Sequence, residues 1–525
     1  MTKLLPLSMA FSLAMALVCA SPAQASASPL AAHLASNQAT SLAGSTASTS
    51  ALVPYQYHLV FSDADRRLVT VNASVTLKGG TLMMASWGYA SQLPQGWATF
   101  VENLVVSNQG KRVPVELLPG GKWKVNAPDG TVLQLRYQVR LQHDQHEWDS
   151  AGGVDARPAL QADSATWITK ALMIFSDDDD AKAQVSFDLP QGWRVATPWH
   201  EVAGKANTFA PADLYQAYDN AIVVGRFEPL TIVNGAMKVV LVMDPQLLAS
   251  RGLFEQVLSQ HLTEYRHVFG ELPDTRYLVA ARKDVADDGE AFGSSFVQVF
   301  KQTDLDARRM VWPRLLAHEM FHYWNASRLK LTDVSAQEWF TEGVTEYMAS
   351  RAAVRGGQIA ERDWYQMLGT NMGRFFSARH MQPGDKPSLQ EAGSKKMQNW
   401  RLIYGGGATL GLLLDIELRT ATQNRRSIDD VFRLREQRFG QTGKACNSQD
   451  LLNLFNEVGG RDFTPFFKDY VQENKKFPPL AEILAKAGWY LTHVADEFYI
   501  APARHADAAA MAVQKGMLQR MALGH

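Results

Sequence analysis

Residues 318–322 read His-Glu-Met-Phe-His, and Glu342 follows in a second apolar segment with helical spacing. Two histidines four residues apart lie on one face of a helix, one turn from each other. Their imidazoles can converge on one zinc ion, and a catalytic zinc usually keeps three protein ligands and one open position. We therefore predict that His318, His322 and Glu342 hold a single zinc ion.

Two further glutamates belong to the same pattern. Glu319 follows the first histidine and is placed to accept a proton from the attacking water. Glu346 lies one helical turn beyond Glu342, where it can accept a hydrogen bond from a ligand histidine. The competing interpretation is a chance match, in which these side chains are solvated on an ordinary amphipathic helix.

Length and composition bound the remaining possibilities. A chain of 525 residues is too long for one hydrophobic core, and its length suggests about three domains. The apolar content of 46% and the charged content of 20% are typical of a folded soluble protein. The net charge of -1 gives no basic excess that would indicate a nucleic-acid or anionic-lipid partner. The oligomeric state stays open.

The beginning of the chain has the pattern of a secretory signal peptide. Lys3 supplies a positive charge, residues 4–20 are apolar, and Ala23-Gln24-Ala25 is a small-x-small cleavage site. We therefore predict a signal peptide at residues 1–25, export to the periplasm or the medium, and no stable membrane span after cleavage. An uncleaved anchor is the alternative, but the apolar run is short for a span.

Periodicity divides the rest of the chain. Residues 26–51 are rich in Ser, Ala and Thr and indicate a flexible linker. Residues 52–230 alternate apolar and polar side chains between Gly- and Pro-rich turns, which predicts an antiparallel β-domain. After it we expect strands at residues 231–243, 277–281 and 296–300, with a helix at 253–268 between the first two. From residue 301 to about 491 we expect mainly helices.

The zinc motif and its neighbours resemble the glycyl aminopeptidase family of gluzincin metallopeptidases. His318-Glu319-Met320-Phe321-His322-Tyr323-Trp324-Asn325 is similar to the family's H-E-x-x-H-x-W-N stretch. Residues 339–347 resemble the segment that carries its third ligand, and residues 404–408 a later Gly-rich segment. The resemblance implies an α+β protein with a thermolysin-like α/β zinc peptidase domain at 231–375 and a C-terminal helical domain at 376–490. We assign the remaining residues, 491–525, to a tail.

The resemblance also implies roles for two residues outside the zinc motif. Tyr404 falls where related aminopeptidases place a tyrosine that hydrogen-bonds the oxyanion of the tetrahedral intermediate. Glu290 falls where they place a glutamate for the free amine of a peptide substrate. The competing interpretations are a core or surface tyrosine and a carboxylate without a ligand. A peptide could lie along residues 296–300 as an added strand.

The sequence departs from the family pattern in ways that concern the substrate. The family's Gly-Gly-Leu-Glu-His stretch is not reproduced around Glu290, and Gly406 stands where the family has a lysine. We therefore predict a zinc aminopeptidase and keep two alternatives. One is an endopeptidase with the same zinc site, and the other is an exported binding protein whose site is catalytically unproductive.

Overall fold

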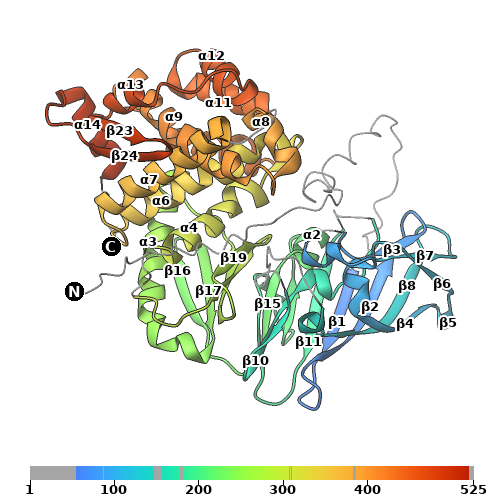
Figure 1. Cartoon of the computed structure of the whole chain (residues 1–525). Helices are drawn as coiled ribbons and strands as arrows, with labels where there is room; N and C mark the ends of the chain where they lie inside the picture. Colours follow the sequence, from blue (N-terminus) through green and yellow to red (C-terminus); the bar gives the residue numbers. More distant parts are fainter. Residues whose placement is uncertain are drawn as a thin grey trace, which may run out of the picture.

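The computed structural model describes residues 55–519 except 87, 147–156, 178–180, 307, 309 and 382–385. The predicted signal peptide and linker lie outside these described residues. Figure 1 shows a β-rich N-terminal part, a green sheet with helices above it, and a helical part furthest from the N-terminal sheets. The predicted α+β class with an N-terminal β-domain and a C-terminal helical part is confirmed.

The largest sheet of the N-terminal part has the strand order β13-β14-β11-β1-β2-β8-β4-β5. Its alternating apolar side chains, such as Val69, Val71 and Tyr137, form one face of a buried core. All pairs are antiparallel except β1 with β11, which is parallel, so the expected antiparallel arrangement holds with one exception. The strands are β1 Tyr55–Val60, β2 Leu68–Thr76, β4 Val101–Asn108, β5 Lys111–Arg112, β8 Val132–Arg140, β11 Ala183–Asp188, β13 His200–Glu201 and β14 Thr208–Ala210.

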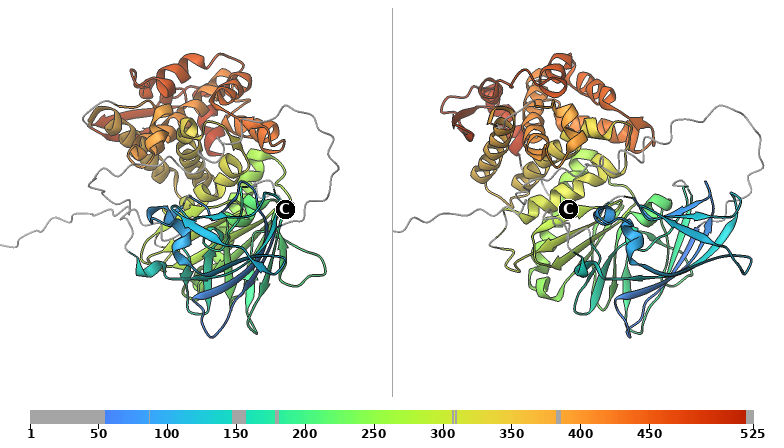
Figure 2. Two further views of the ribbon diagram at one scale, coloured as in Figure 1. Left: turned by 90° about the vertical axis from the view of Figure 1, so that its right-hand side faces the viewer. Right: turned by 45° about the vertical axis from the view of Figure 1, so that its right-hand side comes forward.

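Two smaller sheets and a short helix complete this part. The four-stranded sheet has the order β12-β15-β10-β9, and one of its faces packs through Ile168 and Val223 against the next domain's sheet. This shared apolar layer holds the β-domain against the five-stranded sheet that follows it in the chain. The right-hand view of Figure 2 shows the two sheets side by side. The elements are β3 Thr81–Met83, β6 Val115–Leu118, β7 Lys122–Val125, β9 Ala159–Leu160, β10 Ser164–Ile168, β12 Arg194–Ala196, α2 Leu214–Tyr218 and β15 Ala221–Gly225.

A five-stranded mixed sheet of order β16-β17-β18-β20-β19 supports the predicted zinc motif. Helix α3 (Arg251–Phe269) contributes to the core on the face of this sheet opposite the β-domain. The expected strand at residues 296–300 is present as β20, but β18 and β19 flank it on both sides. The idea that a peptide adds along it is therefore wrong, because β20 has no free edge. The strands are β16 Leu230–Asn234, β17 Met237–Met243, β18 Arg276–Lys283, β19 Asp288–Ala291 and β20 Ser295–Phe300.

The helices after the sheet share one continuous apolar core with it. The boundary that we predicted at residue 375 falls one residue before the end of α7, so it does not separate two cores. The main helical elements are α4 Trp312–His322, η6 Tyr323–Ser327, α5 Val334–Glu338, η7 Trp339–Val344, α6 Thr345–Arg355, α7 Glu361–Phe376, η8 Ser377–Met381, α8 Leu389–Ala392, η9 Gly393–Lys395, η10 Arg401–Gly406, α9 Gly407–Ala421, α10 Ile428–Arg435, η11 Glu436–Gly440, α11 Ser448–Gly459, α12 Thr464–Phe467, η12 Lys468–Gln472 and α13 Leu480–Ala485.

The segment that we assigned to a tail is an ordered part of the fold up to residue 519. It forms a hairpin of β23 (Trp489–Val494) and β24 (Glu497–Pro502), followed by helix α14 (Ala508–Leu518). Phe498 and Ile500 alternate along β24 and join the main core together with Met517. The hairpin packs on α7, where Gly369 brings the helix against the backbone of Phe498.

Candidate active site

Helices α4 and α6 lie side by side and carry the predicted motif residues (Figure 1). Small side chains at Ala317, Ala349 and Ala352 form a buried cluster between the two helices. Small residues at a helix contact let the two backbones approach closely. The approach places the histidines of α4 opposite η7, the helical turn that precedes α6 and carries Glu342.

The structure brings His318, His322 and Glu342 together. One ligand atom from each lies within 4.8 Å of the others. Glu342 Oε2 is 3.3 Å from His318 Nε2 and 3.4 Å from His322 Nε2, so a single carboxylate oxygen faces both imidazoles. Two imidazole nitrogens and one carboxylate oxygen are a donor set typical of catalytic zinc. The residues present therefore fit a zinc ion, and their role as ligands remains our prediction.

Glu346 lies behind the first histidine, as the sequence predicted. Its Oε2 is 3.3 Å from His318 Nδ1, which is within ion-pair distance. The two atoms are not aligned well enough for a hydrogen bond. Its other oxygen pairs with Arg314, which the sequence did not indicate. Burial opposes ionisation, but the Arg314 guanidinium and His318 lower the pKa of Glu346 below its usual range. An ionised Glu346 can orient the His318 ring.

Glu319 projects from α4 toward the edge strand β19. A side chain at Gly289 of β19 would approach Glu319 Cγ to 3.2 Å and Leu315 Cγ to 3.4 Å, so the glycine lets the strand and helix lie in close contact. Burial raises the pKa of Glu319 to about 8, with the His318 charge opposing this shift and the Glu290 charge adding to it. A raised pKa is typical of a group that exchanges protons near neutral pH.

Glu290 is the third residue of β19, the edge strand of the five-stranded sheet. Its side chain is exposed, so a substrate can reach it. Partial desolvation by the protein around it raises the pKa of Glu290 to about 7, while the ammonium groups of Lys170 and Lys396 oppose the shift. The structure thus places Glu290 within electrostatic range of Glu319, and its contact with a substrate amine remains a prediction.

Two lysines near Glu290 were not found from the sequence. Lys170 comes from the β-domain, pairs with Asp219 at 2.6 Å and lies over the ring of Phe292. Lys396 comes from the helical part and contacts Glu342. Nothing in the local sequence around either lysine marks it, because both reach the site only through long-range packing.

Tyr404 lies beside the predicted metal ligands. Its ring stacks on His318 with centroids 6.0 Å apart and planes at 25°. The tyrosine belongs to η10. Gly407, the first residue of α9, packs against Gly343 of η7, and a side chain on either glycine would collide with backbone atoms. Burial first, and then the Glu342 carboxylate, raises the pKa of Tyr404, so its hydroxyl keeps its proton and can donate it in a hydrogen bond.

We predict that Tyr404→Phe lowers kcat about 100-fold, as is typical when an oxyanion donor is removed, and changes KM much less. The hydrogen bond would strengthen only in the transition state, so its loss should appear in kcat. Steady-state kinetics on a free peptide would measure this, with Tyr490→Phe at an exposed position as control. A variant with unchanged kcat would remove Tyr404 from the reaction.

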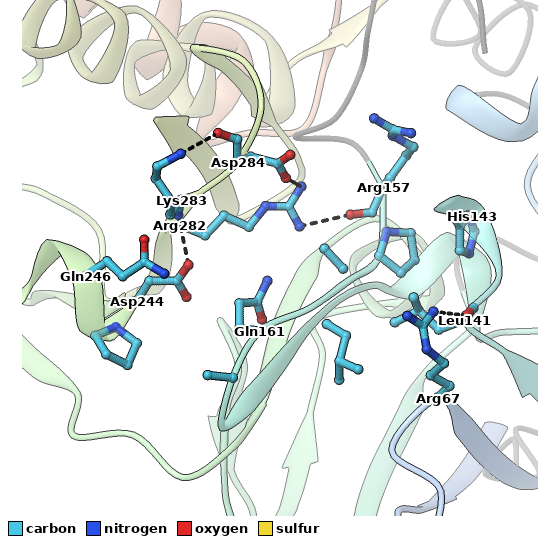
Figure 3. Close-up of a pocket in the computed structure, with 15 residues that line it drawn as sticks. Arg67, Leu141, His143, Arg157, Gln161, Asp244, Gln246, Arg282, Lys283 and Asp284 are labelled. Carbon is cyan, nitrogen blue, oxygen red and sulfur yellow. Dashed lines mark hydrogen bonds and ion pairs between the residues drawn. The ribbon is translucent and has the colours of Figure 1, made fainter. Parts of the chain in front are cut away.

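A separate polar pocket of about 430 Å³ lies between the β-domain and the five-stranded sheet (Figure 3). The buried Arg282 extends along it to the carbonyl oxygen of Arg157 at 3.2 Å, and its guanidinium is 3.4 Å from Asp284. None of the predicted metal-ligating or catalytic residues lines this pocket. The arrangement around His318 is therefore a different site.

Comparison with known proteins agrees with this site. The model of the M61 peptidase N-terminal domain matches residues 56–226, and the model of M61 glycyl aminopeptidase matches residues 312–404, which include the histidine motif, Glu342 and Tyr404. The matched residues make this chain a metallopeptidase. It belongs to the M61 family, whose two matched domains together span about half of its length.

Solved structures show the same fold. An aminopeptidase N family protein from Idiomarina loihiensis is similar with a TM-score of 0.69 at 18% identity, covering 83% of this chain and 79% of that one. An M1 zinc metallopeptidase from Deinococcus radiodurans is similar with a TM-score of 0.50 at 17% identity, covering 81% and 94%. A comparison with curated proteins found no match. At these identities the structural likeness supports the architecture alone.

Proposed function

We propose that this metallopeptidase is a zinc-dependent aminopeptidase of the gluzincin type that acts on peptides after export. The convergence of His318, His322 and Glu342 beside Glu319 is the observation that carries the proposal. Zinc, when bound there, would supply a Lewis acid that polarises a carbonyl and activates water. The export rests on the predicted signal peptide. Among the described residues, no helix is long and apolar enough to cross a membrane.

Each protein group has a separate task in this proposal. Glu319 accepts a proton from the attacking water and later donates one to the leaving amine. Tyr404 donates a hydrogen bond to the oxygen of the scissile carbonyl as negative charge develops on it. Glu346 holds the His318 ring in its orientation. Glu290 accepts the substrate ammonium and so places the first peptide bond at the site.

The edge of the catalytic sheet offers a place for the substrate backbone. β19 is paired on one side with β20, and it is the last strand of its sheet among the described residues. A peptide can extend a sheet by adding to such an edge. A peptide on β19 would pass Glu290, which β19 itself carries, and the Glu319 side chain that packs against Gly289.

One observation favours the endopeptidase alternative. The ammonium groups of Lys170 and Lys396 both act on Glu290 and would repel a third ammonium from the substrate. An endopeptidase would use the same zinc site without this contact.

We expect one zinc per chain, and we expect release of N-terminal residues from free peptides to stop on chelation and to return with zinc. His322→Ala removes one of the three predicted ligands, so this variant should bind no zinc. His200 is exposed and lies outside the site, so His200→Ala should bind zinc normally. Metal analysis and amino-acid release measure these effects. Full activity in protein without metal would refute the proposal.

A further inference from the structure

Lys396 bridges two carboxylates on successive turns of the chain segment that carries the predicted third ligand. Its Nζ is 2.5 Å from Glu342 Oε1 and 3.1 Å from Glu338 Oε2. Glu338 and Glu342 are four residues apart, so they lie on one helix face and one ammonium can reach both. The Lys396 side chain is 26% exposed, whereas that of Glu338 is almost fully buried at 4%. Such a pair differs from a surface salt bridge, which contributes little.

The two oxygens of Glu342 face different partners. Oε2 faces the histidine nitrogens at 3.3 and 3.4 Å, while Oε1 accepts a hydrogen bond from Lys396. A carboxylate without such a partner can rotate, or it can bind a metal through both oxygens. A second oxygen on zinc would occupy the position that a catalytic site keeps open.

The segment that carries Lys396 is held firmly against α5. A side chain at Gly393 would come within 2.0 Å of the Ser335 carbonyl oxygen and 2.8 Å of Glu338 Cγ, so only glycine permits this contact. A capping box between Ser388 and Glu391 starts the preceding helix. Lys396 is therefore presented to Glu338 and Glu342 by packed backbone.

From this geometry we propose that Lys396 is a positioning residue that holds Glu342 as a one-oxygen metal ligand. The proposal rests on the proposed zinc site and deepens it. The lysine fixes Oε1, the buried Glu338 fixes the lysine, and Oε2 alone is presented between the two histidines. The ammonium lies between the two carboxylates and so offsets part of the repulsion between them.

The test compares Lys396→Met with Lys395→Met, whose side chain is exposed on the same segment. Partners that orient a metal ligand typically contribute about 10-fold to 100-fold in metal affinity. We expect Lys396→Met to weaken zinc binding by about that factor and to weaken the visible absorption of the cobalt-substituted protein as a second carboxylate oxygen binds. Lys396→Arg should restore part of both, and Lys395→Met should match the wild type.

The outcomes separate this proposal from the function on which it rests. Unchanged or tighter zinc binding by Lys396→Met, with an unchanged cobalt spectrum, would overturn the role of Lys396 and leave the zinc site intact. A wild-type protein that binds no zinc would instead overturn the proposed function. The melting temperature of the metal-free variants serves as a folding control, since a positioning role predicts little change in it.

Discussion

Replacing Glu319 with glutamine should leave zinc bound and remove nearly all peptidase turnover. The amide is close in shape to the carboxylate but cannot accept a proton, and general-base losses are typically about 100-fold to 10,000-fold. The side chain points toward β19 from the helix of the ligand histidines, so the substitution changes no predicted ligand. Initial rates on a free peptide, together with metal analysis of the same samples, measure both effects.

A second carboxylate serves as the control for a nonspecific effect of losing one negative charge. Glu255 is exposed on α3, and Glu255→Gln should retain the wild-type rate and zinc content. A Glu319→Gln variant with a near-normal rate would exclude Glu319 as the proton acceptor. Loss of zinc in that variant would mean that Glu319 supports the metal rather than the proton transfer.

The zinc motif could be predicted because its geometry is local. His318 and His322 are one helical turn apart, so their common face follows from the spacing alone. Glu342 required a second helix to pack against the first, and the apolar pattern around it made that packing plausible. Glu346 followed from the helical turn after Glu342, and the structure places it against His318.

The sequence did not predict the groups that reach the site by long-range packing. Arg314 forms an ion pair with Glu346, and Lys396 forms one with Glu342. In a sequence, a single arginine or lysine near a helix is usually interpreted as a solvated surface residue. Lys170 belongs to the β-domain and lies over the ring of Phe292, which is part of the apolar layer between the two sheets. None of these contacts leaves a periodic signal in the local sequence.

The β-strands, too, could be predicted from the sequence only in part. Alternation predicted β-strands across residues 52–230, but alternation is the same for either direction of pairing, so the parallel pairing of β1 with β11 was not foreseen. β19 was missed because Asp288, Gly289 and Glu290 have low strand propensity. This short strand nevertheless carries Glu290, the residue that we predict to bind the substrate amine.

Acetylation of the substrate's N-terminus should abolish cleavage if the enzyme is an aminopeptidase. A free ammonium can form a charge-assisted hydrogen bond with Glu290, and an acetamide cannot. Removing one partner of a desolvated charge pair typically costs about 2–5 kcal/mol, which is roughly 30-fold to 5,000-fold in kcat/KM. Matched pairs of free and acetylated peptides, compared at equal concentration, measure this ratio directly.

The Glu290→Gln variant tests whether Glu290 causes the difference in cleavage between free and acetylated peptides. It should raise KM for free peptides and leave the residual rate on acetylated peptides unchanged, because those peptides offer no ammonium to lose. The nearby Lys170 and Lys396 make the result informative, since their charges oppose ammonium binding and only a direct contact with Glu290 could overcome them. Equal cleavage of free and acetylated peptides by the wild type would contradict the aminopeptidase assignment. The zinc site would then serve an endopeptidase, and the lysines beside Glu290 would be the structural reason.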